Sequence, residues 1–178
     1  MKQNGKSGGN SVRTLALILC GAVLAAAVGF AVHAGVTSGA DNEIAVTEET
    51  VRMLENTSDD LLLCYDTGHW TFTETDPLAI LNMFPNRIGH VHLKNMRKPV
   101  RDQAIKESWS FLKSVRNGCF TVPGDPEGCV DFPAVFKKLD EIGYEGWIMV
   151  EAEQDPAKAN PFKYAKMAYE YMVAEMAK

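Results

Sequence analysis

Ile88-Gly-His-Val-His-Leu-Lys-Asn95 is the stretch of sequence from which the fold is predicted. In an extended strand the side chains point to opposite faces in turn, so His90, His92 and Lys94 share one face with Ile88 and the residues between them take the other. Two imidazoles on one face are typical of a wall that lines a site. An exposed edge strand whose histidines have no role would show the same pattern, so this stretch alone leaves both interpretations open.

Two more short apolar runs, Leu61 to Tyr65 and Trp147 to Val150, predict buried strands because each is too short for a helix and is bounded by turn residues. Helical patterns surround the strands, and Asn117 to Gly128 is predicted to be a loop. The helices are expected over Thr47 to Glu55, Asp76-Pro77 to about Phe84, Pro99 to Val115, Asp131 to Gly143, and Asn160-Pro161 towards Lys178. Strands that alternate with helical crossovers pair in parallel, so the predicted fold class is α/β.

Each predicted strand ends in a polar side chain that can bind a metal ion. Asp66 follows the first strand, His92 sits late in the second, and Glu151 follows the third. Parallel α/β sheets collect their chemistry at the carboxyl ends of the strands. Oxygen and nitrogen ligands of this kind suit Mn²⁺, Co²⁺, Mg²⁺ or Zn²⁺. Taken singly, Asp66 would be a helix or turn cap and Glu151 a surface ion pair, but three such residues at three strand ends favour a metal site.

Composition limits the classes of function. The chain has 178 residues, 46% of them hydrophobic, which is enough to bury the core of one domain. A net charge of -5 and no basic stripe with interleaved aromatic residues argue against nucleic acid as a partner. The four cysteines show no CxxC spacing, although Cys119 and Cys129 flank a short loop and could form a disulfide in an oxidising compartment.

The first part of the chain has the layout of a secretory signal or an uncleaved signal anchor. A basic polar leader over residues 1–13 is followed by an apolar stretch over 14–36, long enough to form a helix that spans a bilayer, and by a polar linker over 37–45. This layout predicts a membrane-anchored or exported protein whose folded domain covers residues 46–178. An alanine-rich buried helix is the alternative interpretation of residues 14–36.

Four motifs carry a resemblance to a known family. They are Asp66-Thr-Gly-His69, Gly89-His-Val-His-Leu-Lys94, Phe120-Thr-Val-Pro-Gly-Asp125 and Gly143-Tyr-Glu-Gly-Trp-Ile-Met-Val-Glu-Ala-Glu-Gln-Asp-Pro156. In this order they resemble the carboxyl-terminal part of the inosose dehydratases, within the xylose-isomerase-like sugar isomerase and epimerase family of TIM barrels. The resemblance covers roughly residues 46 to 175. It implies that the domain is the C-terminal part of a TIM barrel.

The resemblance also implies a divalent metal, preferably Mn²⁺ or Co²⁺, with Mg²⁺ or Zn²⁺ as alternatives. Asp66, His92 and Glu151 match three of the family's four metal ligands. His69 resembles a residue that contacts the hydroxyl groups of the substrate, and Glu151 and His69 are therefore the expected catalytic residues. The implied substrate is a cyclic polyol ketone, and the implied reaction class is that of a hydro-lyase or an isomerase.

Four further polar residues lie close to the predicted site in the sequence. Lys94 and Arg97 match the polar rim beyond the metal histidine and are expected to bind substrate. His90 is expected either to orient a ligand or to be a packed imidazole with its hydrogen bonds satisfied. Glu153 is either a second carboxylate of the site or a residue that forms a hydrogen bond within the loop.

The resemblance covers only part of a barrel. A complete TIM barrel has eight strand and helix units and about 250 residues. Only its last three strands are recognisable in this sequence, and the strand that carries the family's other metal-binding glutamate is not among them. The predicted enzyme therefore needs an oligomer or a partner chain to complete it. The alternative is a non-catalytic remnant, tethered or exported, that binds metal or sugar weakly.

The location of the protein is a separate question. The resembled family is cytoplasmic, whereas the predicted leader places this protein at the membrane or outside the cell.

Overall fold

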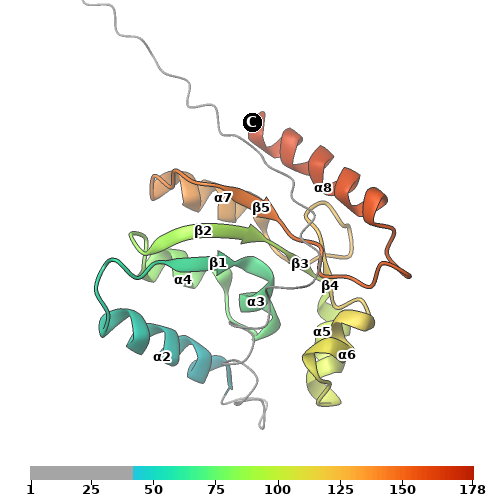
Figure 1. Cartoon of the computed structure of the whole chain (residues 1–178), viewed down its shortest axis with the longest axis horizontal. Coiled ribbons are helices and arrows are strands. Elements are labelled where there is room, and N and C mark those ends of the chain that lie inside the picture. Colours follow the sequence, from blue (N-terminus) through green and yellow to red (C-terminus); the bar gives the residue numbers. More distant parts are fainter. Residues whose placement is uncertain (1–41) are drawn as a thin grey trace, which may run out of the picture.

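The computed structural model describes the backbone of residues 42–178 and the side chains from residue 48 onwards. Within this part, short strands alternate with helices (Figure 1). The elements are α2 (Asn42–Glu55), β1 (Leu63–Asp66), α3 (Thr67–Phe72), α4 (Pro77–Met83), β2 (Ile88–Leu93), β3 (Asn95–Met96), α5 (Lys98–Lys106), α6 (Phe111–Arg116), β4 (Phe120–Thr121), α7 (Phe132–Glu141), β5 (Ile148–Val150) and α8 (Pro161–Met176).

The main sheet has three parallel strands in the order β1-β2-β5. This confirms the parallel pairing that the alternation of strands and helices predicts. The register places Asp66 of β1 beside His92 of β2, and Leu93 of β2 beside Val150 of β5. The carboxyl ends of all three strands therefore meet at one edge of the sheet.

One face of this sheet is apolar and is covered by helices. Tyr65, Val91, Leu93 and Val150 point to this face and are buried. They pack against residues of α4, α7 and α8 in one continuous core, and α4 and α7 lie behind the strands in Figure 1. Burial of this face supplies the hydrophobic stabilisation of the fold.

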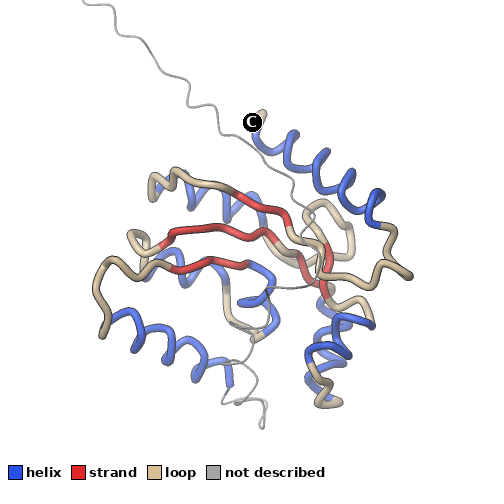
Figure 2. The backbone as a smooth tube through the Cα atoms, in the orientation of Figure 1, coloured by secondary structure: helices blue, strands red, loops and turns tan. Residues whose placement is uncertain are grey.

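The opposite face of the sheet carries polar and sulfur-containing side chains. Cys64 lies level with His90, and Asp66 lies level with His92. Met149 lies beside His92 on the next strand. The tube drawing in Figure 2 shows these strands in front of α4 and α7. The alternation predicted from the Ile88 to Asn95 stretch is thus present, with its histidines on the face opposite the core.

Several predicted helix ends are confirmed. The side chains of Asp76, Asp131 and Asn160 each accept a hydrogen bond from a backbone N–H in the first turn of α4, α7 and α8, respectively. Each cap is followed by a proline within the first two helical positions, where the missing N–H costs nothing. After α7, Gly143 adopts a φ of 67°, which a residue without Cβ does readily, and the chain turns towards β5.

Several predicted elements differ from the structure. The strand predicted from Leu61 begins at Leu63, and Leu61 and Leu62 before it are exposed. Helix α2 begins at Asn42, within the predicted linker, rather than at Thr47. The helix predicted from Pro99 to Val115 is two helices, because Ser108 has a φ of 52° and Ser110 caps α6. The predicted loop from Asn117 to Gly128 contains β4, which pairs antiparallel with β3 in a second small sheet.

The cysteines of the described part are free. Cys119 is buried, with its Sγ 3.6 Å from the Sδ of Met96, and Cys129 is exposed. The disulfide considered for this pair is therefore not formed in the structure. The leader over 1–13, the apolar stretch over 14–36 and most of the linker lie outside the described residues; within residues 42–178, no helix has the length and apolar character needed to cross a membrane.

Candidate metal centre

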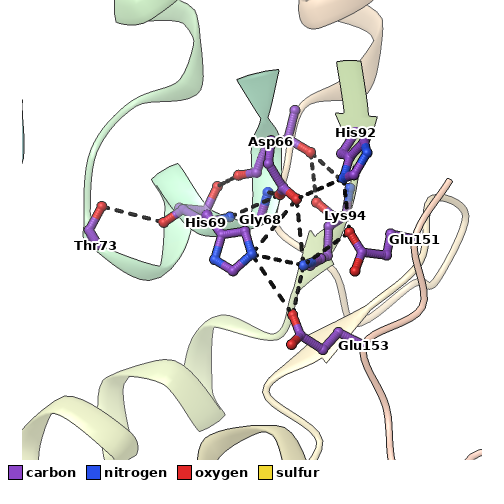
Figure 3. A network of polar contacts seen from close by, with 10 residues as sticks. Asp66, Gly68, His69, Thr73, His92, Lys94, Glu151 and Glu153 are labelled. Atoms are coloured by element: carbon purple, nitrogen blue, oxygen red, sulfur yellow. Dashed lines mark hydrogen bonds and ion pairs between the residues drawn. The ribbon is translucent and has the colours of Figure 1, made fainter. Parts of the chain in front are cut away.

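The site is built around Asp66, which ends β1 and caps α3 at the same time. Its Oδ1 accepts hydrogen bonds from the backbone N–H groups of Gly68 and His69 at 2.9 and 3.1 Å. These bonds fix the carboxylate and leave Oδ2 facing the neighbouring strand (Figure 3). The helix cap and the metal ligand, which the sequence offers as alternatives, are thus compatible in one residue.

His92 and Glu151 bring the second and third candidate ligands to the same point. The Nδ1 of His92 lies 3.0 Å from the Oε2 of Glu151 and 3.6 Å from the Oδ2 of Asp66. One ligand atom from each of the three residues lies within 4.8 Å of the other two. Since ligand bonds to a divalent ion such as Zn²⁺ are about 2.0–2.2 Å long, a small rotation of these side chains suffices for all three to reach one cation. Two carboxylates and an imidazole fit a divalent metal in chemistry as well as in spacing.

The electrostatics keep both carboxylates of this cluster ionised. Burial alone would raise the pKa of Asp66, but the hydrogen bond from His92 and the charge of Lys94 outweigh it and hold that pKa well below its usual range. The hydrogen bond from His92 also lowers the pKa of Glu151. In turn, hydrogen bonds to Asp66, Cys64 and Glu151 raise the pKa of His92 to about 11. Without a metal, His92 is therefore an imidazolium at neutral pH.

Lys94 lies directly beneath this cluster and its side chain is fully buried. Its Nζ lies 2.7 Å from the Oε2 of Glu153, 3.4 Å from the Oε2 of Glu151 and 3.5 Å from the Oδ2 of Asp66. Burial would lower the pKa of Lys94, but these three carboxylates outweigh it and raise the pKa. Lys94, which was expected on the polar rim of the site, is therefore an enclosed cation at its centre.

His69 closes the site from the side of α3. Its Nε2 lies 3.0 Å from the Nζ of Lys94 and 3.8 Å from the Oδ2 of Asp66, and its ring stacks on Phe111 with the centroids 5.7 Å apart. Because an ammonium only donates hydrogen bonds, Nε2 is the acceptor and a neutral ring carries its proton on Nδ1. Burial lowers the pKa of His69, which favours this neutral form.

Two of the residues singled out from the sequence point elsewhere. The guanidinium of Arg97 binds Asp125, the hydroxyl of Tyr164 at 3.1 Å and the carbonyl oxygen of Gly118 at 2.8 Å, so its contacts are with the loops before and after β4 and with α8. His90 lies 3.2 Å from the sulfur of Met149 and meets the ring of His92 edge-on. Neither residue makes a polar contact with the three candidate metal ligands.

Two residues of the site are weakly indicated by the sequence or not at all. Glu153, left open between a site carboxylate and a loop hydrogen bond, directs its carboxylate to Lys94. Thr67 is buried, and its hydroxyl donates to the carbonyl oxygen of Lys94 and accepts from the Lys94 N–H, at 2.8 and 3.0 Å. In the sequence, only its position directly after Asp66 indicates that Thr67 belongs to the site, because Thr67 and its partner Lys94 lie far apart in the chain.

The fold and the site together define a class: parallel β/α units with a candidate metal-ligand set at the carboxyl ends of the strands. Residues 20–173 match the family model described as xylose isomerase-like TIM barrel, and the chain belongs to this family. The match begins within the apolar stretch over residues 14–36, which was predicted to be a signal peptide or signal anchor and lies outside the described part.

Similar proteins agree with this membership. The chain is 52% identical over 130 residues to the inosose dehydratases of Clostridium beijerinckii and Geobacillus thermodenitrificans, which covers 72% of this chain and 43% of each relative. It is 47% identical over 134 residues to the inosose dehydratase of Lacticaseibacillus casei, covering 75% of this chain and 44% of the relative. The chain thus aligns with less than half the length of these relatives.

Proposed function

We propose that this chain forms part of a metal-dependent dehydratase that acts on inosose or a related cyclic polyol ketone. The observation that carries the proposal is the convergence of Asp66, His92 and Glu151 on one point at the carboxyl ends of the strands. The similarity to inosose dehydratases over most of this chain supports the choice of substrate class. Mn²⁺ or Co²⁺ is the proposed metal, since both suit oxygen and nitrogen ligands.

In the proposed reaction, a proton leaves the carbon next to the ketone and a hydroxyl group leaves the next carbon, so that a carbon–carbon double bond and water form. Asp66, His92 and Glu151 would hold a divalent cation, which would supply Lewis acidity to the ketone group. Glu151 stays ionised, accepts this proton and transfers it to the departing hydroxyl group, which leaves as water. His69 contacts a substrate hydroxyl, with its ring held in place by Phe111 and Lys94.

The proposed active form contains further barrel elements in addition to the described part. In residues 42–178 the sheet leaves β1 and β5 as open edges, and Leu62 and Trp147 next to them are about half exposed. Open edges and apolar side chains at a sheet margin favour pairing with additional structure. An oligomer or a partner chain would supply the remaining strands and a fourth metal ligand.

Residues 14–36 are proposed to form a tether, and residues 46–178 are proposed to form the folded domain.

The test is turnover by the full chain. Protein incubated with inosose and Mn²⁺ or Co²⁺ is expected to form the dehydrated product, with a specific activity that rises with protein concentration if assembly is required. His92→Ala is expected to abolish turnover, and Lys98→Met, at an exposed lysine on α5, to leave it unchanged. Absence of turnover with either metal at any protein concentration would reject the proposal.

A second candidate is a non-catalytic protein that binds metal or sugar. It is favoured by the ligand set itself, because the described residues contribute only three ligands to one cation. A metal that binds the folded state raises the melting temperature whether or not catalysis follows. A rise in melting temperature with Mn²⁺, without turnover, would select this second candidate.

A further inference from the structure

The ammonium group of Lys94 lies among the carboxylate oxygens of the candidate metal site. The Nζ of Lys94 lies within 3.5 Å of one oxygen each of Asp66, Glu151 and Glu153 (Figure 3). Two of these oxygens, those of Asp66 and Glu151, belong to the candidate metal ligands. The ammonium group is therefore already bound by oxygens that a metal would use.

The protein holds this ammonium group in place from several sides. Thr67 binds both the N–H and the carbonyl group of Lys94. The backbone of Gly68 packs against the aliphatic stem so closely that a Cβ at position 68 would lie 2.7 Å from the Cβ and Cγ of Lys94. The ring of Phe120 lies 5.3 Å from Nζ. These contacts leave the side chain little freedom to move into solvent.

The positive charge of Lys94 offsets the negative charge of the carboxylates around it. Three carboxylates lie around a fully buried point, and they would repel one another without a cation between them. A buried charge is tolerated when it is paired and hydrogen-bonded, as Lys94 is with Glu153 and His69. The site can therefore keep its geometry before a metal arrives.

We propose that the Lys94 ammonium is a resident cation of this site, and that a divalent ion binding to Asp66, His92 and Glu151 competes with it for the oxygens of Asp66 and Glu151. A cation about 2.1 Å from the Oε2 of Glu151 lies no farther than about 5.5 Å from Nζ, and the two positive charges repel. Glu153, which makes the shortest contact with Nζ, retains the ammonium when the metal takes the other two carboxylates. This inference rests on the metal site of the proposed function.

The first test compares Mn²⁺ binding by the full chain, measured by titration calorimetry, in the wild type, Lys94→Met and Lys98→Met. Lys94→Met removes the buried ammonium, and its affinity for Mn²⁺ is expected to rise about tenfold or more. Its metal-free form is expected to melt at a lower temperature than the wild type. Lys98 is exposed and pairs with Asp102, so Lys98→Met serves as the charge-matched control and is expected to bind as the wild type does. Equal or weaker Mn²⁺ binding by folded Lys94→Met would overturn the inference.

The second test needs no variant and therefore holds if Lys94→Met does not fold. In wild-type protein labelled with ¹⁵N-lysine and with ¹⁵N in the backbone, the Nζ signal of Lys94 is expected to shift on addition of Mg²⁺. The amides of Gly68 and His69, which bind Asp66, report independently that the metal has bound. Shifts of these amides with an unmoved Nζ signal would contradict the competition.

Neither test depends on turnover, so its outcome can be separated from that of the proposed function. Tighter Mn²⁺ binding by Lys94→Met, together with no dehydration of inosose by the wild type, supports the resident cation and rejects the dehydratase. Absence of Mn²⁺ binding in both the wild type and Lys94→Met overturns the competition together with the metal site.

Discussion

The two faces of the β1-β2-β5 sheet differ in what their side chains do, although they alternate along the same strands. Val91 and Leu93 of β2 are fully buried in the core against α4, α7 and α8, whereas His90 and His92 beside them lie on the polar face. The apolar face gains free energy from burial. The polar face gathers like charges that need a compensating cation. Stability and chemistry are thus assigned to opposite sides of one strand.

The apolar face is expected to show the largest effect on stability. Leu93→Ala removes a fully buried side chain and should lower the free energy of unfolding by about 3 kcal/mol, measured by urea denaturation. Leu112→Ala, at an exposed position on α6, is the control and should change it by less than about 0.5 kcal/mol. Similar losses from the two substitutions would break the contrast between core and surface.

The polar face should control metal affinity with little dependence on the core. Glu151→Gln keeps the size of a candidate ligand and removes its charge, so it should weaken Mn²⁺ binding by about 100-fold or more in calorimetry. Glu153→Gln makes the same chemical change at a residue that binds Lys94 instead, and should cost about tenfold at most. A larger effect of Glu153→Gln would contradict the assignment of Glu151 as the metal ligand and of Glu153 as the residue that binds Lys94.

Metal binding should strengthen as the pH rises. The pKa of His92 is raised to about 11 by hydrogen bonds to Asp66, Cys64 and Glu151, so the ring must lose a proton to bind a metal at neutral pH. A higher pH lowers the cost of removing that proton, so the affinity should increase by about tenfold per pH unit between pH 6 and 8. Calorimetry in buffers of different ionisation enthalpy should detect the released proton. An affinity that falls or stays level over this range would contradict this protonation state.

His90 should show the smallest effect on the polar face. It contacts the sulfur of Met149 and the ring of His92, and it makes no hydrogen bond or ion pair with a candidate ligand. His90→Ala should therefore change Mn²⁺ affinity by less than about threefold and the free energy of unfolding by about 1 kcal/mol or less, as measured by calorimetry and urea denaturation. A loss of metal binding equal to that of Glu151→Gln would show that His90 orients the ligands.

The sequence predicts the two faces of the sheet because alternation along β2 is a local property. It predicts the caps at Asp76, Asp131 and Asn160 for the same reason, since each cap acts within one turn of helix. The candidate ligand set also follows, because parallel strands end at a common edge.

Features that depend on contacts between distant residues could not be predicted in this way. Alternation assigns Lys94 to the polar face but does not show that Gly68 and Glu153 enclose it. Arg97 follows β3, which turns away to pair with β4, so its closeness to His92 in the sequence does not bring it to the metal ligands. The break at Ser108 depends on a backbone conformation that a helical pattern of apolar residues does not indicate.

Mn²⁺ binding, counted per chain by electron paramagnetic resonance, tests most directly whether Asp66, His92 and Glu151 share one cation. We expect one Mn²⁺ per wild-type chain, and no bound Mn²⁺ at the same concentration in folded Asp66→Asn or His92→Ala. Unchanged Mn²⁺ binding in these two variants, or no binding in the wild type, would contradict the account.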